Sequence, residues 1–426
     1  MNRLLLGLLA LIFSSFAYAQ NEPDVILMPN ISGVKLYQQG NQTGYPIVAL
    51  NSGELLELHF DDLDGKVKSY AYTFQLCNAD WTPAVLSTFD YLKGFSQTRV
   101  TTYRVSSIAF TKYIHYQALL PDRNSIPTKS GNYLLKVFMD GDMNKVAFTR
   151  RMLVVDRKAD IAAQILQPFN GQLFRTHQKV QFTVNRMQLN AVTPTQQIKA
   201  VILQNNRWDN AAKNIQPTFV RGNSLEFNSE SDCVFPAGRE YRWADLRSFR
   251  FRTERIAKID NEPKSTSITL LPDPEKISQR INFRDYNGAY FIETTDIQNP
   301  WWQSDYATVH FTFAPAGNIP FPDKKVFVVG EMNSYNLHDT SAMTYNAERG
   351  VYEKSLLLKQ GYYSYNYVTK DIKSRGGATV QTENIGGNSI ETENDYTILI
   401  YYRPLAGRHD ELVGYTTINS LNRRGF

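Results

Sequence analysis

Short stretches of alternating apolar and polar residues recur along the chain, with Gly, Asn, Asp or Pro between them. Residues 55–60 (LLELHF) and 133–140 (YLLKVFMD) are two examples, and their period is that of a β-strand with one buried face. No segment longer than about 12 residues shows the 3.6-residue period of an amphipathic helix. The pattern therefore predicts an all-β protein of tandem immunoglobulin-like β-sandwiches. Further predicted strands are 67–77, 113–120, 147–156, 306–313 and 396–404.

Two segments mark expected domain boundaries. Residues 156–174 end one set of strands and open another with a Pro-Phe turn, and residues 296–311 do the same later in the chain. We expect three β-sandwich domains, and no low-complexity linker separates them, which favours close packing. The expected bounds are 22–156, 157–297 and 298–426, after a signal peptide at 1–19.

The first residues are typical of an exported protein. A short positive start with Arg3 precedes an apolar run at 4–16, and small residues follow at Ala17 and Ala19. This pattern is that of a secretory signal peptide, and we expect cleavage between Ala19 and Gln20. The apolar run is shorter than the roughly 20 residues of a membrane span, and no cysteine follows it for lipidation. The sequence thus predicts an exported protein without a lipid anchor.

Composition adds few functional constraints. The net charge of +5 is mild and does not predict nucleic-acid binding. The two cysteines, Cys77 and Cys233, are expected in different domains, with a disulfide as the alternative. The six histidines are scattered and form no H-x-x-x-H pair, so no metal site is predicted.

One acidic stretch and several missing motifs bear on chemistry. Residues 60–65 (FDDLDG) resemble a calcium loop, but Phe60 stands at the first ligand position, so a solvated turn between strands is expected. The chain has no G-x-S-x-G, H-E-x-x-H or C-x-x-C motif and no phosphate-binding glycine loop. We therefore expect no enzyme and no cofactor, although scattered carboxylates of an exported hydrolase remain an alternative.

A basic segment at 238–255 is a candidate partner-binding surface. If it is a strand, Arg250 and Arg252 share one face and Phe249 and Phe251 the other. Such a ridge could dock an acidic partner. The alternative is a solvated strand face whose arginines pair with acids on neighbouring strands. The candidate partner-binding residues in this segment are Arg242, Arg247, Arg250 and Arg252.

Trp81 is the other candidate contact. It follows a predicted strand, in a turn set by Asn78, Asp80 and Pro83. The side chain either packs under the following loop or projects as an anchor for a partner, a role in which Trp is enriched.

Residues 327–368 resemble the early-set sandwiches of starch- and glycogen-binding domains. The resemblance lies in a short apolar strand, a turn carrying Tyr335 and a tyrosine-rich hairpin. Sugar platforms in those domains are usually tryptophans, and this segment has none. A periplasmic carbohydrate-binding module is therefore an alternative function. We expect the hairpin tyrosines to be strand residues, alternately in the core and on the surface: Tyr352, Tyr362, Tyr363, Tyr365 and Tyr367.

A stronger resemblance covers the whole chain after residue 19. Residues 34–95 are similar to the first domain of the type IX secretion system plug protein family, through LYQQGNQTGYPI, L-x-F-D-D-L-D, Y-x-Y-T-F-Q-x-C-N-A-D-W-x-P and Y-L-K-G-F. Five later segments fit the same family: 130–138, 238–250, 299–313, 392–404 and 407–420.

This resemblance implies a role. Proteins of that family lie on the periplasmic side of the outer membrane and close the mouth of a giant β-barrel translocon while a shuttle protein occupies its lateral opening. It implies a monomer that reaches the membrane only through the translocon, without catalysis, cofactor or nucleic acid.

Overall fold

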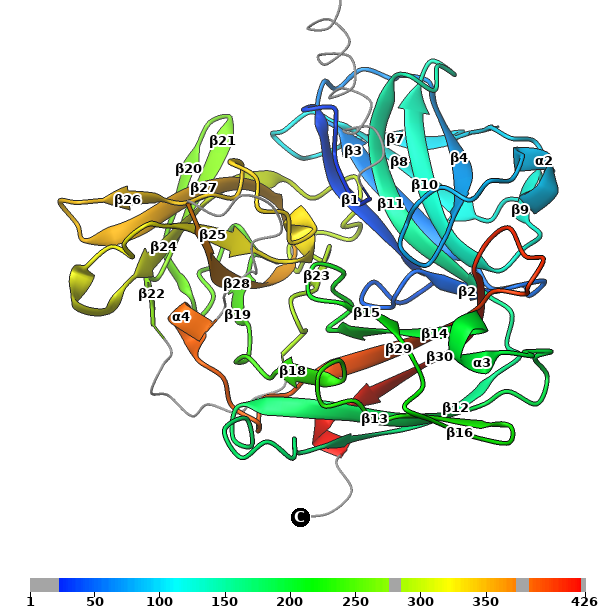
Figure 1. Ribbon diagram of the computed structural model, residues 1–426. Coiled ribbons are helices and arrows are strands. Elements are labelled where there is room, and N and C mark those ends of the chain that lie inside the picture. The colour runs from blue at the N-terminus through cyan, green and yellow to red at the C-terminus, as the bar shows by residue number, and fades with distance from the viewer. Residues whose placement is uncertain (1–22, 276–284, 373–382, 423–426) are drawn as a thin grey trace, which may run out of the picture.

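The structure is a computed structural model that describes residues 23–275, 285–372 and 383–422. The expected signal peptide, with Ala19 and Gln20, lies outside the described residues. Within them the fold is almost all β, and paired sheets form three sandwiches grouped around a common centre (Figure 1). The all-β prediction is confirmed.

The N-terminal sandwich encloses a core of alternate residues from its two sheets, such as Leu58, Phe60 and Tyr133. A short helix, α2 (Thr88–Tyr91), and a small hairpin of β5 (Leu92–Gly94) and β9 (Ser125–Pro127) lie at one end. One sheet runs β1 (Ile31–Gln38), β3 (Leu56–Asp62), β8 (Ile114–Leu120), β7 (Thr102–Val105). The other runs β2 (Ile47–Ala49), β11 (Val146–Val155), β10 (Gly131–Met139), β4 (Tyr70–Cys77), β6 (Thr98–Arg99).

The middle sandwich also has two sheets, and a one-turn helix, α3 (Pro194–Gln197), leads into its central strand β14. One sheet contains β12 (Asp160–Leu166), β13 (His177–Asn185), β17 (Ser224–Phe227), β16 (Phe219–Arg221) and β18 (Val234–Pro236). The other runs β15 (Ala212–Ile215), β14 (Ile198–Gln204), β29 (Asp395–Tyr402), β30 (Glu411–Asn419).

The third sandwich lies between these strands in the sequence, and its sheets share an aromatic core that includes Phe311, Phe313 and Tyr365. One sheet contains β19 (Arg242–Asp245), β28 (Tyr362–Asp371), β23 (Tyr290–Phe291) and β25 (Lys324–Val329). The other contains β20 (Ile256–Glu262), β21 (Ser265–Leu270), β22 (Asp273–Pro274), β24 (Tyr306–Ala314), β27 (Val351–Lys359) and β26 (Thr344–Asn346).

Strand pairing does not follow the expected boundary between residues 297 and 298. Strand β29 pairs with β14 from Ile198↔Tyr402 to Gln204↔Tyr396, so the chain returns to the middle sandwich after building the third. The cause is the run YTILIYY, which is apolar on both faces and needs cover on both. Tyr396, Ile398 and Ile400 enter the middle core, whereas Leu399 and Tyr401 pack toward the N-terminal sandwich.

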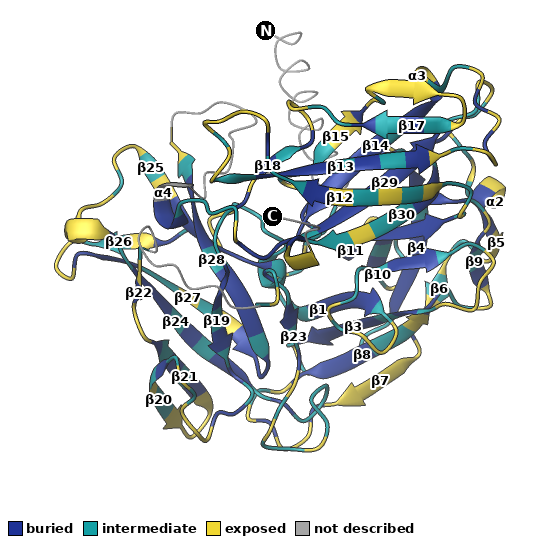
Figure 2. Cartoon of the chain, turned by 90° about the horizontal axis from the view of Figure 1, so that it is seen from below, coloured by how far each residue is buried: buried dark blue, intermediate teal, exposed yellow. Residues whose placement is uncertain are grey.

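Burial follows this arrangement (Figure 2). Edge strand β7 is exposed along its length, whereas the neighbouring β3 and β8 are largely buried, including polar residues on their outer face. Among the described residues, no helix has the length and apolar character needed to cross a membrane.

Candidate functional sites at the domain junctions

The outer face of the N-terminal sheet is polar and yet buried. In β3, Leu58 and Phe60 point into the sandwich, so Glu57, His59 and Asp61 point outward by the two-residue period of a strand. The third sandwich covers this outward face, and Asp61 is only 1% exposed. The face therefore forms a domain junction instead of a solvated surface.

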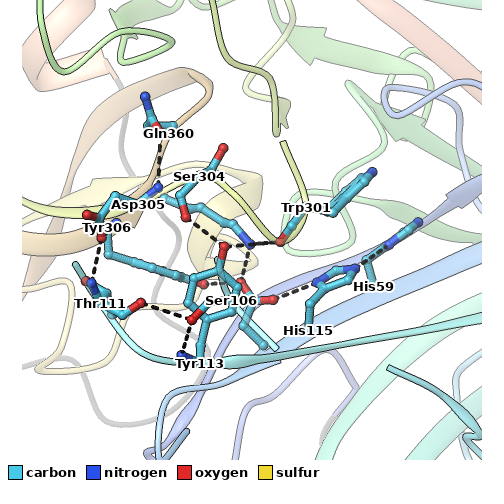
Figure 3. A network of polar contacts seen from close by, with 12 residues as sticks. His59, Ser106, Thr111, Tyr113, His115, Trp301, Ser304, Asp305, Tyr306 and Gln360 are labelled. Atoms are coloured by element: carbon cyan, nitrogen blue, oxygen red, sulfur yellow. Dashed lines mark hydrogen bonds and ion pairs between the residues drawn. The ribbon is translucent and has the colours of Figure 1, made fainter. Parts of the chain in front are cut away.

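A hydrogen-bonded network that includes His115 and Tyr306 (Figure 3) centres on the Asp61 carboxylate. The Lys359 ammonium, at the end of β27, donates to Asp61 Oδ2 at 2.5 Å and to the Trp301 carbonyl at 2.5 Å. The Tyr306 hydroxyl donates to the same oxygen at 2.6 Å. On the other side, Asp61 Oδ1 lies 2.7 Å from His115 Nδ1, because Asp61 and His115 are paired across β3 and β8. Four buried polar groups from two domains thus satisfy one another.

The network continues toward the surface through a second histidine. His115 Nε2 lies 3.0 Å from His59 Nδ1, and His59 Nε2 lies 3.3 Å from the half-buried Glu57 carboxylate. The Trp301 ring stacks on the His59 ring with 3.8 Å between centroids. Trp301 therefore covers a chain of ionisable groups and excludes water from it.

Burial and neighbouring charge set the pKa values in this network. Burial lowers the pKa of His115 to about 4, and the Lys359 charge adds to the shift against the opposing effect of Asp61. Burial also lowers the pKa of His59, against the raising effect of Glu57. Burial alone would raise the pKa of Asp61, but Lys359 and His115 hold it below its usual range. At neutral pH the arrangement is an Asp61–Lys359 ion pair flanked by neutral histidines.

A second ion pair joins the same two domains. The buried Lys35 ammonium, on β1, donates to both carboxylate oxygens of Glu331 at 2.7 Å and to the Tyr290 carbonyl at 2.7 Å. The Tyr290 hydroxyl in turn donates to the Val34 carbonyl at 3.0 Å. The N-terminal and third sandwiches are therefore held by two separate sets of buried charged contacts.

Sequence reasoning missed this junction. The expected solvated turn at 60–65 is wrong for Asp61 and Asp62, which end a buried strand. Asp62 accepts hydrogen bonds from the Tyr70 hydroxyl and the Asn30 amide. The scattered histidines also come together, since His59 and His115 meet across adjacent strands. The alternation of apolar and polar residues in LELHFDD could have indicated this junction, because it places Glu57, His59 and Asp61 on one face of the strand.

Trp81 lies between the N-terminal and middle sandwiches and is half-buried. Its ring packs edge-on against Trp208, with centroids 5.0 Å apart, and the Arg151 guanidinium lies 5.1 Å from its centre. Its backbone has a φ of +69°, which fits the tight turn expected around it. In the structure, therefore, Trp81 is a contact between domains.

The basic segment does not form the predicted strand face. Only Arg242–Asp245 is strand, and the following residues bend because the Ser248 hydroxyl accepts the N–H groups of Arg250 and Phe251. Phe249 is consequently buried while Phe251 is exposed. The expected alternation across 249–252 is wrong.

The four candidate arginines consequently have different environments. Arg242 is 2% exposed and is bound to Asp273, Asn366 and the Pro274 carbonyl, so it is not available to a partner. Arg247 is half-buried and pairs with Asp245 and Glu293. Arg250 and Arg252 are exposed, and Arg252 donates to the Ala257 carbonyl.

The tyrosines of the third sandwich are mostly core residues. Tyr352, Tyr363, Tyr365 and Tyr367 are buried and Tyr362 is half-buried, so the tyrosines are strand residues as expected but none of them is fully exposed. Tyr335 lies in a tight turn, its ring covered by the Arg207 guanidinium at 4.6 Å. That guanidinium occupies a face on which a sugar would stack.

A cavity of about 630 Å³ lies where the three sandwiches meet. All three sandwiches contribute to its wall. The lining residues include Asp24, Tyr45, Arg150 and Arg151 from the N-terminal sandwich, residues 205–209, Glu393 and Asp395 from the middle one, and Asp285, Tyr286, Asn287, Ala289, Glu331, Ser334, Tyr335 and Asn336 from the third. Its volume is within the range of small-molecule sites.

The remaining titratable groups offer little chemistry. Cys77 and Cys233 are both buried and unpaired, in different sandwiches, and burial raises their pKa values to about 12 and about 11. Within residues 23–275, 285–372 and 383–422, no cluster of His, Cys, Asp or Glu could hold a metal ion.

Comparison with known families identifies the chain. Residues 31–156, the N-terminal sandwich, match the first domain of the type 9 secretion system plug protein. The N-terminal sandwich is therefore a first domain of this plug protein family. No curated protein matches the chain significantly.

A solved structure extends the similarity beyond the first domain. A hypothetical protein from Parabacteroides merdae, known from a crystal structure, is 32% identical, with a TM-score of 0.88. The match covers 93% of this chain and 99% of that one, so the similarity includes all three sandwiches. The plug family links the protein to type IX secretion and to the periplasm, and it is not an enzyme family.

Proposed function

We propose that the protein is a non-enzymatic periplasmic plug that binds the outer-membrane β-barrel translocon of the type IX secretion system and occludes its periplasmic opening as a monomer. The observation that carries the proposal is the match of residues 31–156 to the plug protein first domain. Occlusion requires a rigid protein large enough to cover the opening, and it requires no catalysis.

The domain junctions support this role. A buried ion pair, Asp61 with Lys359, and a partly buried one, Lys35 with Glu331, join the N-terminal and third sandwiches. An apolar cluster that includes Leu153, Trp208 and Leu399 joins the N-terminal and middle sandwiches. Large apolar interfaces with satisfied buried charges restrict relative domain motion. A chain whose domains move little relative to one another should keep its shape while it occupies the opening.

The exposed arginines remain candidates for docking. We propose that Arg250 and Arg252 face acidic groups at the translocon mouth, since both are exposed on a bend of the third sandwich. Exposed charges chiefly set association rate and orientation. Arg242, being buried, is assigned a structural role, and Arg247 is already paired with two acids.

The test is purification of the tagged protein from native membranes. The giant barrel should co-purify with the wild-type protein, and a deletion strain should admit bulky antibiotics when its translocon is held open. Absence of the barrel from the purified complex, or unchanged permeability of the deletion strain, contradicts the proposal.

The docking residues need a kinetic measurement with purified translocon. Arg250→Glu combined with Arg252→Glu should slow association at low salt and flatten its salt dependence. The Debye length is about 8 Å at physiological salt and longer at low salt, so attraction between exposed charges acts over a greater distance at low salt. A matched double reversal elsewhere, Lys145→Glu with Arg221→Glu, should leave the rate unchanged. An unchanged on-rate in the first variant removes this bend from the docking surface.

A further inference from the structure

The cavity at the junction of the three sandwiches contains a cation without a carboxylate partner. Arg150, on β11, is half-buried, and its guanidinium donates to the adjacent Thr149 carbonyl at 2.8 Å. Among the described residues, no carboxylate lies within ion-pair distance of it. The nearby acids are engaged elsewhere, since Asp24 pairs with Arg151 and Glu331 pairs with Lys35. Burial lowers the pKa of Arg150, and the opposing effects of Asp24, Tyr290 and Glu331 do not offset it.

Another part of the same cavity is rich in hydrogen-bond acceptors. The Asp395 carboxylate accepts from the amides of Asn287 and Asn419 at 3.2 and 2.8 Å and has no cationic partner among the described residues. The Asn287 Oδ1 atom is buried and accepts no hydrogen bond. Asp285 lies beside them, and burial, together with the neighbouring Glu393 and Glu240 carboxylates, raises its pKa to about 7. Among the described residues, Asp395 is therefore held by amide donors and not by a cation.

Different neighbouring acids act on the pKa values of Arg150 and Asp285. The acids that act on Arg150 are Asp24 and Glu331, whereas those that act on Asp285 are Glu393 and Glu240. The cavity wall also carries the aromatic residues Tyr45, Trp208 and Tyr335. Among the described residues, the wall thus has Arg150 without a carboxylate partner, aromatic side chains, and Asp395 without a cationic partner.

The backbone around the cavity is held in unusual conformations. Residues with φ between +51° and +58° line its wall, although side chains other than Asn rarely adopt that region. Conformations of this kind cost about 1–3 kcal/mol each and concentrate at ligand sites. The residues are Asp24, Asn205, Asn206, Asn287, Ser334 and Tyr335.

We propose that this cavity binds a short zwitterionic peptide, whose terminal carboxylate pairs with Arg150 and whose ammonium group is held by Asp395 and Asn287. A polyanion such as phosphate would be repelled by Asp395, and an organic cation by Arg150. A neutral sugar would leave the Arg150 charge unpaired. A peptide with both end groups satisfies both regions and places a side chain against the aromatic wall.

The test uses three forms of one tripeptide, Ala-Tyr-Ala, titrated calorimetrically into the full mature chain. The free peptide should bind at least about tenfold more tightly than its C-terminal amide and its N-acetyl form, since each loses a hydrogen bond between charged groups. Arg150→Gln should abolish the preference for the free acid over the amide. Asp395→Asn should abolish the preference for the free amine over the acetylated form. Each preference therefore reports on one end of the site.

Controls separate binding from folding. Arg250→Gln, outside the cavity, should keep both preferences, and Arg150→Lys should keep the preference for the acid if Arg150→Gln does not fold. Absence of binding by the free peptide at millimolar concentration overturns the proposal, and so does equal affinity of the three peptides for the wild-type chain. Binding of inorganic phosphate that competes with the peptide and is lost in Arg150→Gln would overturn the assignment of a dipolar ligand. The inference does not rest on the proposed function, because translocon co-purification and peptide titration fail independently.

Discussion

Replacement of Lys359 by Met removes the one cation within ion-pair distance of Asp61 among the described residues. Met has a similar length and leaves the packing against Tyr113 and Tyr306 largely intact. Asp61 remains 1% exposed, without its cation. Loss of one partner from a buried ion pair costs about 3–5 kcal/mol of unfolding free energy, because the other charge stays desolvated. We expect this loss at pH 8.

The loss should shrink at lower pH. In the wild-type protein, burial, with a contribution from Lys359, lowers the pKa of His115 to about 4. Without Lys359, Asp61 attracts a proton to His115 and raises its pKa. Once that folded-state pKa exceeds the unfolded value of about 6.5, protonation of His115 stabilises the fold below that pH, and the gain disappears as pH rises. Lys359→Met should therefore be closer to wild type at pH 6 than at pH 8.

Chemical denaturation at both pH values measures the effect. Lys325→Met is the matched control in the same sandwich, because Lys325 forms an exposed pair with Asp339 worth at most about 1 kcal/mol. A loss below about 1 kcal/mol for Lys359→Met at pH 8 refutes the assignment of a charged Asp61. A deficit that grows on acidification refutes the proposed uptake of a proton by His115.

Three further predictions test other contacts. In the wild-type protein the lowered pKa of His115 means that the folded state binds fewer protons than the unfolded state below about pH 6.5. The unfolding free energy should therefore fall by up to about 3 kcal/mol toward pH 4. His115→Gln should flatten this decline, and an unchanged slope contradicts the prediction. Trp81→Ala should lower unfolding free energy by about 1–3 kcal/mol through lost contacts with Trp208 and Arg151, and an unchanged melting temperature would mean that the ring is not a structural contact. Arg242→Met should cost about 3 kcal/mol because it leaves Asp273 buried with one fewer cation, whereas Arg250→Gln should stay within about 0.5 kcal/mol; equal losses would contradict their different burial.

The alternation of apolar and polar residues along each strand predicted the β-sandwiches, but it did not predict which domains would cover their outer faces. In LELHFDD, the apolar positions correctly indicate which residues enter the N-terminal core. The polar positions have the same pattern whether water or another domain covers them. Asp61 was therefore expected in a solvated turn, although the third sandwich buries it.

The order in which the strands pair could not be predicted from the sequence, for a related reason. A strand buried on both faces, such as Asp395–Tyr402, shows an apolar run that any sheet could accept. Nothing local distinguishes pairing with β14, about 190 residues earlier, from pairing with a neighbouring hairpin. The expected boundary at 297 consequently divided the third sandwich and left β29 and β30 with the wrong partners.

The inserted order of the domains explains why the unusual chemistry lies at their junctions. Because the chain leaves the middle sandwich after β18, builds the third and returns at β29, both connections pass the same region. Tyr241, in the first connection, donates its N–H to Asp285, and Glu393 lies at the end of the second connection. Asp285, Asn287, Glu393 and Asp395 all line the central cavity. Opening the third sandwich away from the N-terminal one would expose Lys359 and His115 and would also dismantle that cavity. Stability of the interdomain ion pairs and occupancy of the cavity are therefore thermodynamically linked, so a bound ligand should make separation of the domains more difficult.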